Sequence, residues 1–159
     1  MIILGVDPGS HATGYGVIET GPVVRMLGGG VIRCARGAPL PDRLLTIHTE
    51  LTAAIAKFNP MAMAVEDLFN AKNARSSLVL GHARGVILLA GSTAGLPVAE
   101  YAPREIKQAL TGNGAAAKEQ VRFMVMRLLK LKEEPPLDQS DALAVALAYT
   151  NRSRRIGPG

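Results

Sequence analysis

Two short apolar runs, each closed by an acidic residue, constrain the fold of this chain more than any other feature. The first run is residues 1–6 before Asp7, and the second is residues 61–65 before Glu66. Continuous apolar runs of this length predict buried strands. Because the carboxyl ends of parallel strands meet at one edge of an α/β sheet, we expect both carboxylates to lie at that edge.

Periodicity and turn residues place the other elements around these two strands. We expect further strands at residues 15–20, 23–33 and 97–101, and helices at 41–58 and 78–94. After residue 103 we expect three more helices. The first is short and basic, the second ends near residue 131, and the last follows Pro135-Pro136. Three antiparallel strands followed by strand-helix crossovers predict an α/β fold, a five-stranded mixed sheet flanked by helices.

Length and composition suit one globular domain, since the chain has 159 residues and 48% of them are hydrophobic. We expect the domain to span residues 1–150 and a basic, disordered tail to occupy 151–159. No apolar stretch reaches membrane length, and no secretory signal precedes the first strand. The lone Cys34 suits a reducing compartment. These features predict a soluble, cytoplasmic protein that does not bind membranes.

Two further acids, Asp138 and Asp141, open the last predicted helix. Their spacing of three places both side chains on one helical face. As a structural alternative, Asp138 could cap the helix and Asp141 could interact with the helix dipole. If the pair joins Asp7 and Glu66, however, the four carboxylates repel one another unless a cation holds them. Ligand sets made only of oxygen favour magnesium or manganese.

The net charge of +5 is concentrated in residues 102–132. That segment has two acids, Glu105 and Glu119, and seven bases: Arg104, Lys107, Lys118, Arg122, Arg127, Lys130 and Lys132. Such a concentration is typical of a phosphate-binding face, although a solvated helix surface explains it equally well.

Phe69 directly follows the second acidic strand end and lies among Lys72, Asn73 and Arg75. An exposed aromatic ring among bases can stack on nucleotide bases, whereas a buried ring would only anchor the chain. With 4% aromatic residues in the chain, the basic surroundings favour stacking.

The helix predicted at residues 78–94 is apolar nearly all round and therefore needs cover on every side. Gly81 and Gly85 are four residues apart and would let another backbone approach closely. The cover could come from a two-fold-related copy of the chain, or the helix could lie at the centre of the core.

Taken in order, several motifs resemble one known family over residues 1–149. They are the segments 5–10, 13–16, 66–69, 71–74, 80–85, 118–121 and 138–144 (GVDPGS, TGYG, EDLF, AKNA, LGHARG, KEQV and DQSDALA). This pattern is similar to that of the RuvC family of bacterial Holliday junction resolvases. The resemblance implies an RNase H-like fold, a homodimer, and paired nicking of four-way DNA junctions together with the branch-migration proteins RuvA and RuvB.

Matched position by position, the resemblance implies specific roles for individual residues. The metal-binding acids correspond to Asp7, Glu66, Asp138 and Asp141. The implied cofactor is a pair of Mg²⁺ ions about 4 Å apart, with Mn²⁺ as a possible substitute, and the products carry 5′-phosphate ends. The resemblance also implies DNA contacts for Phe69, Lys107 and Lys118, of which the two lysines lie near the scissile backbone. The surroundings of Phe69 and the basic segment add further candidate DNA contacts, namely Lys72, Asn73, Arg75, Arg104 and Arg122.

Two positions depart from the pattern of the family. Asp67 stands where an amide is common, and His82 stands where glutamine is frequent. Neither departure removes a ligand, but Asp67 leaves open which of two neighbouring acids binds metal.

Three other classes of protein fit parts of the sequence. An actin-like phosphotransferase would use the Asp7-x-Gly9 loop, but such enzymes need two lobes and 159 residues provide one. A non-catalytic junction-binding module would need only the basic segment. A nuclease for structured RNA would share the fold and the metals, so the sequence pattern separates it poorly from a DNA enzyme.

Overall fold

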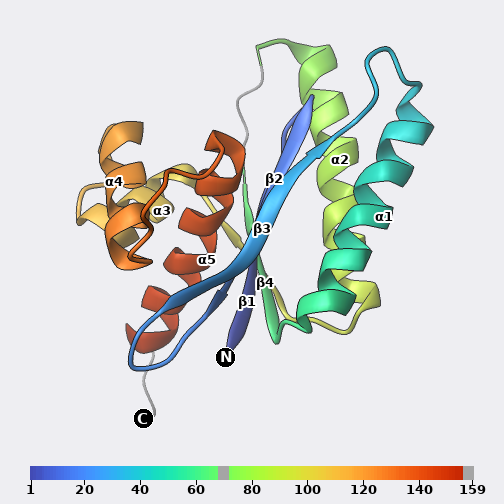
Figure 1. Cartoon of the computed structure of the whole chain (residues 1–159). Helices are drawn as coiled ribbons and strands as arrows, with labels where there is room; N and C mark the ends of the chain where they lie inside the picture. The colour runs from blue at the N-terminus through green and yellow to red at the C-terminus, as the bar shows by residue number, and fades with distance from the viewer. Residues whose placement is uncertain (68–71, 156–159) are drawn as a thin grey trace.

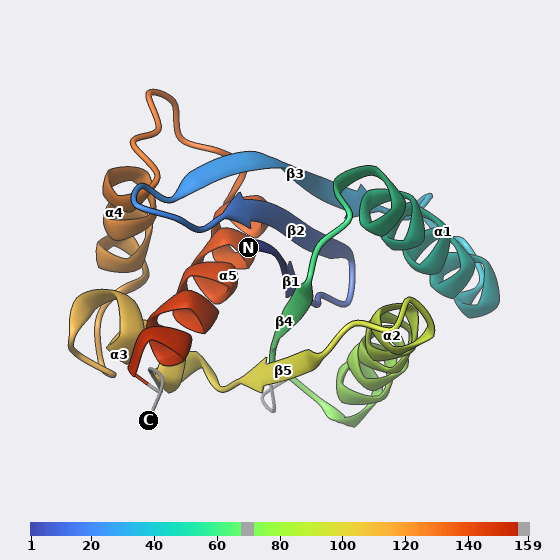
Figure 2. The same cartoon turned by 90° about the horizontal axis from the view of Figure 1, so that it is seen from below.

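The computed structural model describes residues 1–67 and 72–155. Five strands of these residues form one mixed sheet in the order β3-β2-β1-β4-β5 (Figures 1 and 2). They are β1 (Ile2–Asp7), β2 (Ala12–Glu19), β3 (Arg25–Arg33), β4 (Ala62–Glu66) and β5 (Val98–Tyr101). β1 to β3 pair antiparallel, whereas β4 runs parallel to β1, and β5 parallel to β4. The predicted mixed sheet is confirmed.

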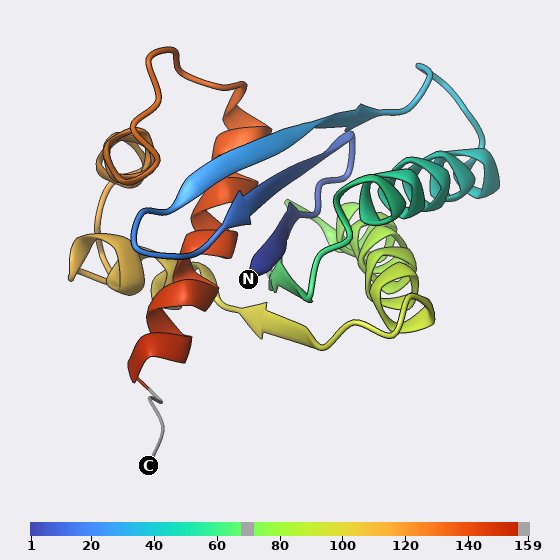
Figure 3. The same ribbon diagram turned by 60° about the horizontal axis from the view of Figure 1, so that its bottom comes forward.

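Helices cover both faces of this sheet. They are α1 (Leu40–Phe58), α2 (Ala74–Thr93), α3 (Pro103–Thr111), α4 (Lys118–Leu128) and α5 (Leu137–Arg155). α1 and α2 lie side by side on one face, and α5, with α3 and α4 outside it, lies on the other (Figures 2 and 3). Among the described residues, none of the helices combines the length and hydropathy that a membrane crossing requires.

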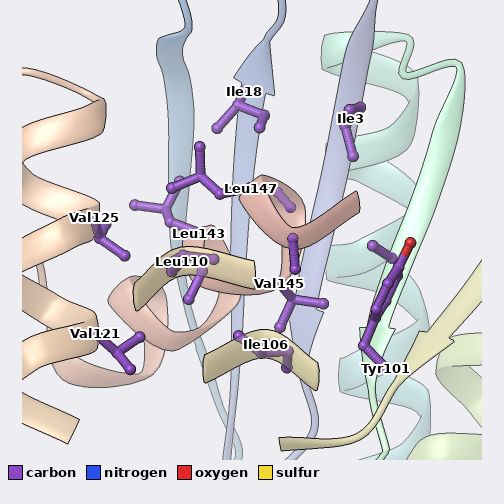
Figure 4. Packing of buried hydrophobic residues seen from close by; sticks show 14 of the residues in the cluster. Ile3, Ile18, Tyr101, Ile106, Leu110, Val121, Val125, Leu143, Val145 and Leu147 are labelled. Carbon is purple, nitrogen blue, oxygen red and sulfur yellow. The ribbon is translucent and has the colours of Figure 1, made fainter. Parts of the chain in front are cut away.

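Alternate residues of the central strands supply the two hydrophobic cores. In β1, Leu4 and Val6 belong to the core shared with α1 and α2. Ile3 belongs to the core shared with α5, where it lies with Leu143 and Leu147 (Figure 4). Because successive side chains of a strand point to opposite faces, the register of β1 decides which face each later residue occupies.

Three helix boundaries differ from those predicted, one of them being the end of α4 at Leu128 rather than near residue 131. α2 begins at Ala74 rather than near residue 78, because the Asn73 side chain accepts a hydrogen bond from the Ser76 backbone N–H at 2.9 Å and so caps the helix earlier. α5 continues through Arg155, so the first residues of the predicted tail at 151–159 belong to a helix.

Candidate active site

Asp7 and Glu66 are neighbours at the carboxyl ends of two parallel strands. The register pairs Val6 of β1 with Val65 of β4, and the two acids are the next residues of their strands. Ala64 packs in the α5-side core, so strand alternation directs Glu66 to that face, and Asp7 likewise. Both carboxylates therefore point toward α5.

The first turn of α5 reaches these acids because glycines let the helix approach the sheet closely. A Cβ atom at Gly14 would collide with the backbone carbonyl of Asp138, and one at Gly5 would collide with that of Ala142. Gly14 is also the β2 partner of Asp7, so the closest contact between helix and sheet lies beside the acid. These glycines thus bring the start of α5 against the ends of β1 and β2.

This packing gathers carboxylates from distant parts of the chain. Oxygen atoms of Asp7, Asp138 and Asp141 lie within 4.8 Å of one another, and Glu66 forms a hydrogen bond with Asp7. α5 begins at Leu137, so Asp138 lies inside the first turn rather than at the cap position. The four acids line one pocket of about 300 Å³.

Four acids outnumber the two lysines in this pocket, and the pKa values of three of the acids are raised. Burial, followed by the charge of Glu66, raises the pKa of Asp7 from 3.8 to about 10. Burial also raises the pKa of Glu66 and of Asp141. Carboxyl groups held this way bind protons in place of a cation, and a divalent ion would displace those protons. Four oxygen-donating side chains in one pocket fit a hard cation such as Mg²⁺.

The basic residues divide between the pocket and the outer surface. Lys107 of α3 and Lys118, the first residue of α4, line the same pocket as the acids. Lys118, with Arg122 one turn later, counteracts the raised pKa of Asp141. Arg104 is exposed on α3, outside the lining of the pocket. All six residues predicted to be catalytic therefore share one pocket, and their catalytic roles stay predictions.

The DNA contacts predicted around Phe69 are not part of this pocket. Phe69 lies outside the described residues, so its proposed stacking stays a prediction. Lys72 and Arg75 are exposed at the start of α2. Asn73 has a structural role as the cap of α2, which the sequence analysis overlooked.

Asp67 is separated from the metal-binding candidates by the sheet. Arg84 of α2 lies 3.1 Å from its carboxylate, on the face opposite α5. The question of which neighbouring acid faces the pocket is thereby answered, because Glu66 lines it and Asp67 does not. Sequence reasoning missed Arg84 altogether, since nothing in the spacing of residues 67 and 84 indicates an ion pair.

The outer face of α2, formed by Leu78, Gly81, His82, Gly85 and Leu89, is exposed. Leu89 is 58% exposed, and no other part of the described chain lies within 4 Å of a Cβ atom built at Gly81 or Gly85. The opposite side of α2 packs into the core through Ala83, Ile87 and Ala90. The expected cover on every side is therefore absent from the described part of this chain.

Comparison with known proteins assigns a family to this arrangement. The family profile described as "Crossover junction endodeoxyribonuclease RuvC" matches residues 3–149. The chain belongs to the RuvC family. The RuvC protein of Syntrophotalea carbinolica is 53% identical over 152 residues, covering 95% of this chain and 94% of that protein. The RuvC protein of Myxococcus xanthus is 51% identical over 162 residues, covering 99% and 84%.

A solved RuvC structure has the same fold. The RuvC of T. thermophilus, solved in complex with a Holliday junction substrate, superimposes with a TM-score of 0.92 at 39% identity. The alignment covers 98% of this chain and 96% of that one. The RNase H-like fold implied by the sequence resemblance is confirmed.

Proposed function

We propose that this chain is a structure-selective endodeoxyribonuclease that resolves four-way (Holliday) DNA junctions by paired, symmetric cuts in recombination and repair. The observation that carries the proposal is the pocket at the ends of β1 and β4, where four acids and two lysines meet. Membership of the RuvC family supports DNA junctions as the substrate class.

The four acids would hold the metal cofactor, which we take to be two Mg²⁺ ions per pocket with Mn²⁺ as a substitute. When bound, such ions supply Lewis acidity that activates the attacking water and stabilises the leaving 3′-oxygen. Asp7 and Glu66 are fixed by strands, and Asp138 and Asp141 by a helix packed on glycines, so the ligands are held before substrate arrives.

The lysines would act on the DNA rather than on the metal. Lys107 and Lys118 enter the pocket from α3 and α4, whereas Asp7 and Glu66 come from the strands. Their ammonium groups would bind the scissile phosphate and neutralise the charge that develops on it. Phe69 would stack on a base where the junction is unpaired. The products would carry 5′-phosphate and 3′-hydroxyl ends.

Two symmetric cuts need two pockets, and the outer face of α2 is the surface we assign to a homodimer. The face is apolar, and its glycines leave room for a second backbone. A two-fold axis through this face would match the two-fold symmetry of a four-way junction. Cooperation with RuvA and RuvB in the cytoplasm follows from the family resemblance and belongs to the same proposal.

One cleavage experiment tests the proposed function. Purified protein with Mg²⁺ is incubated with a labelled four-way junction, a linear duplex of the same sequence and an RNA hairpin. We expect paired nicks on the junction and none on the duplex. Cutting of the RNA alone would identify a ribonuclease, and binding of the junction without cutting by the metal-loaded protein would identify a non-catalytic module.

A further inference from the structure

An ion-pair network lies directly behind the acidic pocket, on the other face of the sheet. Arg84 of α2 approaches Asp67 at 3.1 Å, and it donates a hydrogen bond of 2.7 Å to Glu100 of β5. The side chains of Arg84 and Asp67 are only 19% and 18% exposed, whereas that of Glu100 is 43% exposed. The contact with Asp67 is therefore the more sheltered of the two, and less screened by water.

This network holds the chain at the point where β4 ends. Glu66 is the last residue of β4, and the next residue, Asp67, donates its backbone N–H to the Tyr101 carbonyl at 2.8 Å. Arg84 fixes the Asp67 side chain from the opposite face. The peptide between Glu66 and Asp67 is thus fixed by a backbone hydrogen bond and by an ion pair.

The position of Glu66 is set by opposing contacts at the end of β4. Its carboxylate forms a hydrogen bond with Asp7, while the charge of Asp141 repels it and the charges of Lys118 and Lys107 attract it. It is also the one acid of the four that lies outside the group whose oxygens are all within 4.8 Å. The place of the Glu66 carboxylate therefore depends on the backbone conformation at the end of β4.

We propose that Arg84 is a positioning residue for Glu66, which it holds in the metal-binding pocket by pairing with Asp67 from the other side of the sheet. The inference rests on the proposed function for its consequence in catalysis, but its effect on metal binding is independent of the substrate. Groups that orient metal ligands typically contribute ten- to a hundredfold in metal affinity or activity.

The test measures metal binding directly. Calorimetric titration of Mn²⁺ into Arg84→Met should give an affinity about tenfold weaker than the wild type. The Mg²⁺ concentration that gives half-maximal junction cutting should rise by a similar factor, while junction affinity in a gel shift stays the same. Asp67→Asn should reproduce both effects, and combining it with Arg84→Met should add little, since both variants break one link.

Two further variants separate positioning from general stability. Arg84→Lys keeps a positive charge and should recover part of the metal affinity. Glu100→Gln removes only the exposed contact of Arg84 and should change metal affinity less than twofold. If Glu100→Gln lowered metal affinity as much as Arg84→Met does, the proposal that Arg84 acts through Asp67 would be wrong.

Outcomes for the inference and for the proposed function are distinct. Unchanged Mn²⁺ affinity in both Arg84→Met and Asp67→Asn would overturn the inference. The inference would also be wrong if the variants lost activity only in proportion to a lower melting temperature and added metal did not restore it. Should Arg84→Met fail to fold, Arg84→Lys and Asp67→Asn carry the test. A wild type that binds Mn²⁺ but leaves junctions intact would refute the proposed function alone.

Discussion

The two faces of the sheet are covered in different ways. Against α1 and α2, branched side chains such as Val6 and Ile87 fill the space between helix and sheet. Against α5, Gly5 and Gly14 remove that space, and the helix backbone rests on the strands. In the second arrangement no flexible side chain lies between helix and strands at these contacts, so the position of α5 is fixed closely. Asp138 and Asp141 therefore lie on the more tightly placed helix.

The largest effect should come from removing a carboxylate on the α5 face. Asp7→Asn should lower junction cutting at least about a thousandfold, because a central ligand loses its charge. Junction binding in a gel shift should survive, since Lys107 and Lys118 remain. Retained cutting would remove Asp7 from the mechanism and weaken the contrast between the faces.

The second-largest effect should come from adding a side chain between α5 and the sheet. Gly14→Ala places a methyl group against the Asp138 carbonyl, so we expect a loss of about 2 kcal/mol in unfolding free energy and a large drop in cutting. Chemical denaturation and junction assays measure the two effects. Gly21→Ala, between β2 and β3, is the matched change at a position where a Cβ atom would meet nothing closer than 3.9 Å, and it should leave stability nearly unchanged. Equal losses in both variants would contradict the comparison.

A charge on the outer face of α2 tests whether that face binds a second copy. Leu89→Asp should shift the protein from dimer to monomer in sedimentation and replace paired cuts by single nicks. Leu45→Asp, at another exposed leucine on α1, is the control and should leave the dimer intact. A Leu89→Asp dimer would move the interface elsewhere.

The effect of least consequence for cutting should be a pH dependence of the metal-free protein, since bound metal removes it. The pKa of Asp7 is raised from 3.8 to about 10, so the folded state binds a proton more tightly than the unfolded state. Its contribution to stability is complete below pH 3.8 and is lost as pH rises toward 10. Between pH 6 and 8 we expect a loss of roughly 2 kcal/mol, measured by denaturation in chelator. Mg²⁺ should restore stability at pH 8, and Asp7→Asn should flatten the profile.

The sequence predicted the acidic site because the chemistry lies at strand ends and in one helical turn. Asp7 and Glu66 close apolar runs, and period-two alternation then places them on one face. The distance between α5 and the sheet was not predictable in this way, because Gly14 reads equally well as a loop residue. The role of Gly14 depends on which face of β2 packs against α5, and this is a property of the tertiary structure.

One feature of α2 was misjudged, and another was left open. The start of α2 at Ala74 could have been predicted, since Asn73 is a favourable capping residue. Asn73 was interpreted as a DNA contact instead. Which side of α2 is exposed could not be predicted, because a helix that is apolar all round gives no preferred direction for burial. The pair formed by Arg84 and Asp67 likewise depends on how α2 lies across β4 and β5.

The acids that meet beside β1 are separated by most of the polypeptide. Asp7 comes from the first strand and Asp141 from the last helix, so translation of nearly the whole chain precedes completion of the pocket. A nascent or truncated product that ends before α5 would contain all five strands of the described sheet yet lack Asp138 and Asp141. If the four acids act together as proposed, such fragments would not cut DNA.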